Sequence, residues 1–81
     1  MKEVQKKLSS MRISAESGGG TVKATVDGEA NLLDLEIDTA LLDIDELKVL
    51  PKLIKKAIQE AQKDARKQVM SDMKGMLGGM M

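Results

Sequence analysis

The period of the apolar residues changes once along the chain, and this change limits the possible folds more than any other feature. Between residues 11 and 38, apolar and polar residues alternate, which is typical of strands with one buried face. After residue 50, apolar residues recur every three or four positions, which is the period of an amphipathic helix. The sequence therefore predicts an α+β fold in which a small sheet precedes a long C-terminal helix.

Three alternating segments and two turns make up the predicted sheet. The apolar positions of the segments are Met11, Ile13 and Ala15; Val22, Ala24 and Val26; and Leu33, Leu35 and Ile37. The Asp27-Gly28 pair is a strong signal for a two-residue hairpin, and residues 17–20 predict a four-residue turn. The predicted pairs are Val26 with Glu29 and Val22 with Leu33, then Glu16 with Thr21 and Ile13 with Ala24. Both turns bring the apolar sets to one face, so we predict a three-stranded antiparallel meander.

The C-terminal helix has two chemically different faces. Pro51 suits a first helical turn, so the main helix is expected to begin near Leu50, and residues 45–48 are compatible with a preceding helical turn. The apolar face consists of Leu50, Ile54, Ala57, Ile58, Ala61, Ala65, Val69 and Met76. Nearly opposite, within a sector about 60° wide, lies a lysine stripe that consists of Lys52, Lys56, Lys63, Lys67 and Lys74.

The lysine stripe favours an anion-binding face over a plain solvated face. A solvated face normally mixes signs, because like charges four residues apart destabilise a helix. Lys52 with Lys56 and Lys63 with Lys67 are such like pairs. A second basic segment stands at the front, where residues 1–10 predict a short helix with Val4 and Leu8 on its apolar edge.

Composition excludes several classes of function. The chain has 81 residues and contains no Cys, His, Phe, Trp or Tyr, so the commonest general base, thiolate chemistry and base stacking are all missing. Its glycines at 18–20 lead into a strand, whereas a phosphate-binding loop leads into a helix. The acids Asp34, Glu36 and Asp38 belong to the solvent side of the third strand, and those at 43, 45 and 46 lack the spacing of a calcium loop. We expect neither an enzyme nor a metal site.

Charge is segregated although the net charge is zero. Residues 1–12 carry a net charge of +3, residues 13–50 of −7 and residues 51–81 of +4. Such segregation favours nucleic-acid binding, whereas the zero total argues weakly against it. No segment reads as a signal peptide or a membrane span, so we expect a cytoplasmic protein without a membrane partner.

The order of these pieces resembles one known family. The stretch "SGGGTVKATVDGEANLLDLEID", followed by "ALL" and "LIKKAIQEAQKDARK", is similar to the YbaB/EbfC family of nucleoid-associated DNA-binding proteins. The resemblance covers nearly the whole chain. It implies an α–β–β–β–α protomer and a tight homodimer whose long helices project like the arms of tweezers. It also implies DNA binding with little or modest sequence preference, in the bacterial cytoplasm and nucleoid, with no catalysis and no cofactor. The lack of aromatic residues favours double-stranded DNA over single strands, and we expect no small-molecule substrate.

The resemblance also suggests which residues meet DNA and where the parts of the chain begin and end. By position and charge, the DNA-binding residues would be Lys2, Lys6, Lys7, Lys63, Arg66, Lys67 and Lys74. Residues 1–81 would form a single domain, with a helix at 1–10, the sheet at 11–38, a helical region at 45–77 and a flexible tail at 78–81. The front helix is shorter than the family usually has, and Pro51 stands where the family continues a helix. A dimeric protein-interaction module without strong DNA binding remains the alternative.

Overall fold

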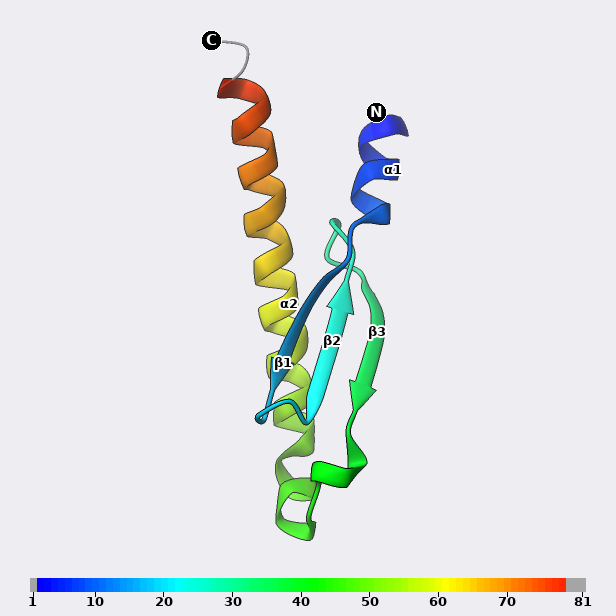
Figure 1. The fold of residues 1–81 in the computed structure, drawn as a ribbon, viewed down its shortest axis with the longest axis vertical. Helices are drawn as coiled ribbons and strands as arrows, with labels where there is room; N and C mark the ends of the chain where they lie inside the picture. The colour runs from blue at the N-terminus through cyan, green and yellow to red at the C-terminus, as the bar shows by residue number, and fades with distance from the viewer. Residues whose placement is uncertain (1, 79–81) are drawn as a thin grey trace.

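The computed structural model describes the backbone of residues 2–78 and the side chains of residues 5–74. The elements follow in the order α1 (Lys2–Ser10), β1 (Ile13–Ser17), β2 (Val22–Val26), β3 (Leu32–Ile37), a short 3₁₀ helix η1 (Thr39–Leu41) and α2 (Ile44–Gly78). This order confirms the predicted α–β–β–β–α arrangement (Figure 1). The expected flexible tail begins at Gly78, the last residue of α2, and its remainder lies outside the described residues.

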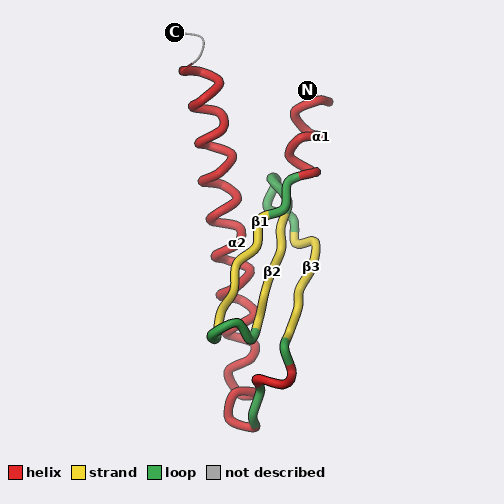
Figure 2. Tube along the Cα trace, in the orientation of Figure 1, coloured by secondary structure: helices red, strands yellow, loops and turns green. Residues whose placement is uncertain are grey.

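A single antiparallel sheet in the order β1-β2-β3 lies against α2. The helix packs on β1 and β2, and both views show it running along one face of the sheet (Figures 1 and 2). The buried core joins four strand residues to three alanines of the helix: Ile13, Val22, Ala24 and Val26 with Ala57, Ala61 and Ala65. The predicted apolar face of the helix therefore covers the sheet from Leu50 to Ala65, whereas the side chain of Met76, also predicted for this face, lies outside the described residues.

The β1–β2 turn differs by two residues from the predicted register. Ser17 stays in β1 opposite Val22, and Ile13 pairs with Val26 instead of Ala24. The three glycines of the turn all have φ between 65° and 97°, a region that residues with a Cβ rarely adopt. A Cβ on Gly18 would lie 2.9 Å from the Leu53 Cδ1 of α2. Because the shift is even, the same side chains still face the core.

The β2–β3 turn is longer than the predicted two-residue hairpin. Val22 pairs with Ile37 instead of Leu33, and an irregularity between Thr25 and Val26 places Leu32 opposite Val26. Leu33 is consequently 44% exposed, although alternation predicted a core position for it. The physical reason lies in Asp27, whose carboxylate accepts N–H groups from within residues 27–31 and so stabilises a wider loop.

Helix α2 begins at Ile44, so the helical turn expected at residues 45–48 is continuous with the main helix, which was expected to begin near Leu50. Asp43 caps the helix, because its carboxylate accepts the N–H of Glu46 at 2.8 Å and its carbonyl accepts the N–H of Leu47 at 3.1 Å. This capping stabilises a first helical turn that precedes Pro51. Pro51 lies inside the helix and leaves the Leu47 carbonyl without a helical donor. Leu47 is at the surface, where water can serve as the donor.

The alanine face of α2 gives the first prediction. Ala61 is fully buried, so Ala61→Leu forces extra atoms between helix and sheet and should lower the free energy of unfolding by about 1–3 kcal/mol. Gln68→Leu, at an exposed position of the same helix, is the matched control and should change it little. Urea denaturation followed by circular dichroism, at one fixed protein concentration, measures both. Equal stability of the two variants would contradict the observed packing.

Candidate nucleic-acid interface

Two helices project beyond the sheet at the same end of the molecule. Figure 1 shows α1 and the C-terminal part of α2 extending past the loop between β2 and β3. We call residues 62–78 the α2 arm, because the side chain of Gln62 contacts that loop and the helix continues beyond it. The molecule is elongated, with principal extents of 55 × 22 × 15 Å. Side chains on these two helices can therefore approach one extended partner from the same side.

Most of the basic residues singled out from the sequence lie on these two helices and are exposed. On α1 these are Lys6 and Lys7, and on the α2 arm they are Lys63, Arg66, Lys67 and Lys74. The backbone of Lys2 belongs to α1, but its side chain lies outside the described residues. The fold thus brings the two predicted basic groups to one end, although they are about sixty positions apart in the sequence.

The lysine stripe is divided between the two ends of the molecule. Lys63, Lys67 and Lys74 lie on the α2 arm, whereas Lys52 and Lys56 lie near the β1–β2 turn, at the level of Leu53. All five are exposed. With a rise of about 1.5 Å per residue, Lys63 and Lys67 stand about 6 Å apart along the helix axis. Only the C-terminal part of the lysine stripe therefore lies at the end of the molecule from which α1 projects.

Many of the acidic residues lie away from the projecting helices, although Asp64 and Asp72 are exposed on the α2 arm and Glu29 lies in the loop beside α1. Two of the acids at the far end stabilise the backbone. Asp38 accepts the N–H of Ala40 at 3.1 Å and caps η1, and Asp43 caps α2. Both lie where the chain passes from β3 into α2, at the end of the sheet opposite α1 (Figure 1). Among the side chains that the structure describes, no group of three acids could hold a metal ion.

Arg12 is a base whose role the sequence did not reveal. Its guanidinium donates to the carbonyl of Ser9 at 2.9 Å and to that of Met11 at 2.8 Å. These carbonyls lie at the C-terminal end of α1, where a cation also interacts favourably with the helix dipole. Arg12 therefore caps α1 instead of extending from it like Lys6 and Lys7.

Asp27 is the buried acid beside this cap. It is only 4% exposed, and its carboxylate accepts the N–H of Glu29 at 2.9 Å and that of Asn31 at 3.0 Å. The Asn31 N–H contributes most to holding the pKa of Asp27 below its ordinary value of 3.8, followed by the Asn31 amide, the Glu29 N–H and the Arg12 charge, while burial opposes them. The ionised form thus stabilises the loop between β2 and β3.

Comparisons with known proteins match residues 1–80 to the YbaB/EbfC DNA-binding family. The chain is 37% identical over 81 residues to a nucleoid-associated protein of Chlorobium chlorochromatii, covering 100% of this chain and 71% of that protein. It is 32% identical over 78 residues to a nucleoid-associated protein of Koribacter versatilis, covering 96% of this chain and 77% of that protein.

A solved structure shares the fold. The chain is similar to the crystal structure of the uncharacterized protein HP0035 from Helicobacter pylori, with a TM-score of 0.73 and 21% identity, covering 93% of this chain and 87% of that one. None of the helices in the described part of the chain combines the length and the apolar composition that crossing a membrane requires.

The lowered pKa of Asp27 predicts how stability depends on pH. A carboxyl whose pKa is lower in the folded state stabilises the fold above its ordinary value of 3.8, and this stabilisation is lost as the pH falls through the lower folded value. Asp27→Asn should therefore be less stable than wild type at pH 7, and the difference should shrink below pH 3.8. Urea denaturation at several pH values measures it. Asp34→Asn, at an exposed position of β3, is the control, and a pH-independent deficit in Asp27→Asn would contradict the prediction.

Proposed function

The chain belongs to the YbaB/EbfC DNA-binding family, and we propose that it is a nucleoid-associated protein whose homodimer binds double-stranded DNA through α1 and the α2 arm, with little sequence preference. The observation that carries this proposal is the position of Lys6, Lys7, Lys63, Arg66, Lys67 and Lys74, exposed on two helices that project at one end of the fold. Lys2, on the backbone of α1, is included by its charge and position.

The mechanism is electrostatic. Lysine ammonium groups on the two helices neutralise DNA phosphates and release condensed counterions, which drives binding without reference to base sequence. Arginine is the side chain that most often recognises guanine. Among the basic residues proposed to contact DNA, Arg66 is the single arginine and the others are lysines. The chain contains no aromatic residue, and stacking on aromatic rings is how proteins usually hold single strands. These features favour duplex DNA and weak sequence preference.

A second copy of the chain is the partner that the apolar surface favours. α2 covers β1 and β2, and β3 forms one edge of the sheet. Apolar residues are exposed from β3 through η1 into the first turns of α2, namely Leu32, Leu33, Leu41, Ile44, Leu47 and Val49. Successive exposed apolar residues of this kind usually mark an interface. A two-fold dimer would double the number of projecting helices and hence the phosphate contacts.

The cellular location follows from the same proposal. The relatives are named as nucleoid-associated proteins of bacteria, so we place this chain in the cytoplasm, on the nucleoid. Its partners would be duplex DNA and a second copy of itself, with no role for a membrane or a small-molecule substrate. The nucleoid is where a protein of low sequence preference finds most of its binding sites.

A protein-interaction module remains the second candidate, and the exposed methionines favour it. Met70 and Met73 are 60% and 57% exposed on the α2 arm, and Met70 lines a shallow groove together with Lys67, Ser71 and Lys74. Methionine adapts to irregular apolar partners. A salt titration with duplex DNA separates the two candidates, because only the first gives a steep loss of affinity with salt.

Charge reversal on the α2 arm tests the proposed function. Lys63→Glu with Lys67→Glu changes two exposed residues per chain, so a dimer would lose about four phosphate contacts. The slope of log affinity against log salt should fall by roughly 3 to 4 units, at about 0.9 per contact. The loss should be similar on two unrelated duplexes, because phosphate contacts carry no base information.

The chain supplies a matched control for this experiment. Lys52→Glu with Lys56→Glu makes the same charge change at the same spacing, on exposed positions of the same helix at the other end of the sheet. This variant should keep most of the affinity. Circular dichroism verifies the fold of both. Equal effects of the two double variants would remove the α2 arm from the interface, and no duplex binding by wild type at low salt would favour the protein-interaction module.

The exposed apolar residues predict a dimer that dissociates when charged residues replace them. Wild type should sediment as a dimer at micromolar concentration. Ile44→Asp with Leu47→Asp should weaken it, because these residues are 79% and 54% exposed and carboxylates at a helix N-terminus do not destabilise the helix itself. Lys48→Asp, which adds negative charge in the same turn without removing an apolar side chain, is the control. Sedimentation velocity measures all three, and a folded wild-type monomer would refute the dimer.

A further inference from the structure

The loop between β2 and β3 is hydrogen-bonded to both projecting helices. We call residues 27–31 the clamp loop. The N–H of Gly28 donates to the carbonyl of Leu8 in α1 at 2.8 Å. The side-chain amide of Gln62 in α2 donates to the carbonyl of Ala30 at 3.2 Å. One short loop thus connects two helices that are distant in the sequence and that carry the exposed basic residues.

On the α1 side, the contact depends on the absence of a side chain at Gly28. A Cβ at this position would lie 2.8 Å from the Met11 sulfur and 2.9 Å from both the Leu8 Cδ2 and the Leu8 carbonyl oxygen. Gly28 is not among the glycines with positive φ, so the position requires space and not an unusual backbone conformation. The close approach brings α1 directly onto the clamp loop.

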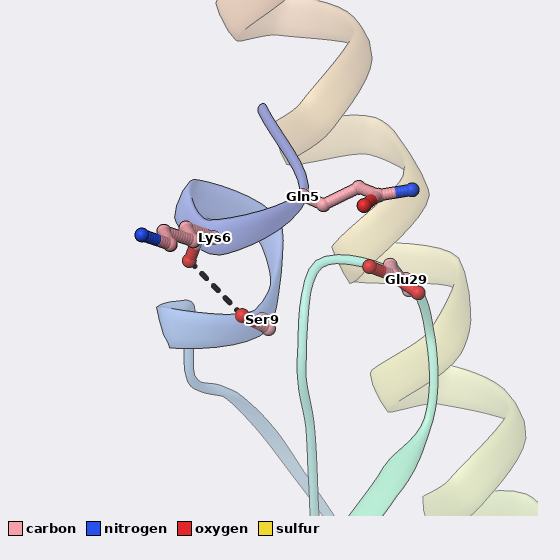
Figure 3. A pocket seen from close by; sticks show the side chains of 4 residues that line it. All are labelled: Gln5, Lys6, Ser9 and Glu29. Carbon is pink, nitrogen blue, oxygen red and sulfur yellow. Dashed lines mark hydrogen bonds between the residues drawn. The ribbon is translucent and has the colours of Figure 1, made fainter. Parts of the chain in front are cut away.

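The end of α1 is fixed by further contacts. The Leu8 carbonyl also accepts the N–H of Met11 at 3.2 Å, and the Arg12 guanidinium donates to the carbonyls of Ser9 and Met11. Figure 3 shows Ser9 on the side of α1 near the loop that carries Glu29, and Lys6 pointing away from that loop. The contacts with the loop therefore orient α1 and leave Lys6 and Lys7 exposed to another molecule.

On the α2 side, the loop carries a backbone distortion that presents the accepting carbonyl. Ala30 has φ 67°, a left-handed conformation that residues with a Cβ seldom adopt. The Asp27 carboxylate accepts the N–H groups of Glu29 and Asn31 on either side of Ala30. Gln62 is half-buried, and its side-chain amide donates to the Ala30 carbonyl. The next residue along α2 is Lys63.

We propose that the clamp loop sets the spacing between α1 and the α2 arm, so that lysines of both helices contact the same duplex, and that Gly28 and Gln62 are positioning residues for DNA binding. This inference rests on the DNA binding proposed above. The physical basis is preorganisation. When the two helices are held at a fixed spacing, contact of one helix with phosphates places the other helix in reach of its own phosphates. When the helices move freely, ordering them on binding costs free energy and weakens the affinity for DNA. Neither Gly28 nor Gln62 needs to contact DNA for this effect.

The experiment measures spacing and binding in the same variants. The chain contains no cysteine, so Gln5→Cys in α1 and Gln68→Cys in the α2 arm, both exposed, provide unique positions for spin labels. Labelled protein is mixed with excess unlabelled protein, so that pulsed electron resonance reports the distance within one chain. Gln62→Leu removes the donor at similar size, and Gly28→Ala displaces α1. Gln59→Leu, at an exposed position of the same helix, is the matched control.

The expected result couples the two measurements. Gln62→Leu should broaden the distance distribution and weaken duplex binding by about twofold to tenfold, the range of one hydrogen bond, with a smaller salt slope because fewer lysines engage together. Gly28→Ala should shift the distribution further, and Gln59→Leu should match wild type in both readouts. Melting followed by circular dichroism identifies any variant that loses affinity only by unfolding.

Three outcomes would overturn the inference. Unchanged distances in Gln62→Leu and Gly28→Ala would show that the loop does not set the spacing. Broadened distances with unchanged affinity and salt slope would show that the spacing does not matter, while the proposed DNA binding would stand. A wild-type protein that binds no duplex at low salt would refute the proposed function and this inference together.

Discussion

Close packing of an alanine face against a two-strand surface is the interaction on which the rest of the structure depends. Ala57, Ala61 and Ala65 are fully buried against strand residues such as Val22 and Val26. Small side chains let the helix backbone approach the sheet, so a core without any aromatic residue can still be dense. This packing involves the middle of α2 and the first turn of the α2 arm, which contains Ala65. Both ends of the helix continue beyond it, one toward the exposed apolar residues and the other into the α2 arm.

The antiparallel topology explains why the basic residues of α1 and those of the α2 arm lie at one end. Strands β1, β2 and β3 alternate in direction, so a chain that enters the sheet from α1 leaves it at the far end after β3. The helix α2 then returns along the sheet, and its C-terminal part projects beside α1 (Figure 1). The acids that cap η1 and α2 lie at the far end, where the chain turns. A net charge of zero is therefore compatible with an excess of basic residues at one end, because the field near a surface depends on how charges are distributed.

The sequence predicted the parts of the fold that depend on periodicity and missed those that depend on single side chains. Alternation gave three strands, and the alanine and lysine positions gave both faces of α2. The register across the second turn was wrong, because a two-residue Asp-Gly hairpin was expected, whereas the Asp27 carboxylate stabilises a wider loop and Ala30 adopts the left-handed conformation. The main helix was expected to begin near Leu50 after a separate turn at residues 45–48, whereas the structure joins the two into one helix that begins at Ile44, for a similar reason. Pro51 is a strong local signal, but the Asp43 cap begins the helix earlier.

Part of the candidate interface could be predicted from the sequence, because periodicity indicates which residues of α2 are exposed. The exposed lysines of the α2 arm follow from helical periodicity, and their position beside α1 follows once the number of strands is known. The contacts of Gly28 and Gln62 could not be inferred, since they depend on the conformation of the clamp loop. The Asp27-Gly28 pair did mark this loop as a turn, but its hydrogen bonds to Leu8 and from Gln62 have no sequence signature.

The stability of the α2 arm depends on its continuity with the packed part of the helix. Short helices are marginal in water because nucleation is unfavourable, whereas adding turns to an existing helix is not. The packed segment around Ala57 and Ala61 supplies that nucleus, and the arm extends from it. Lys63 and Lys67 are like charges four residues apart, which slightly destabilises the arm. If DNA binds at the proposed interface, its phosphates would neutralise this repulsion and so remove the destabilisation from the helix once the complex has formed.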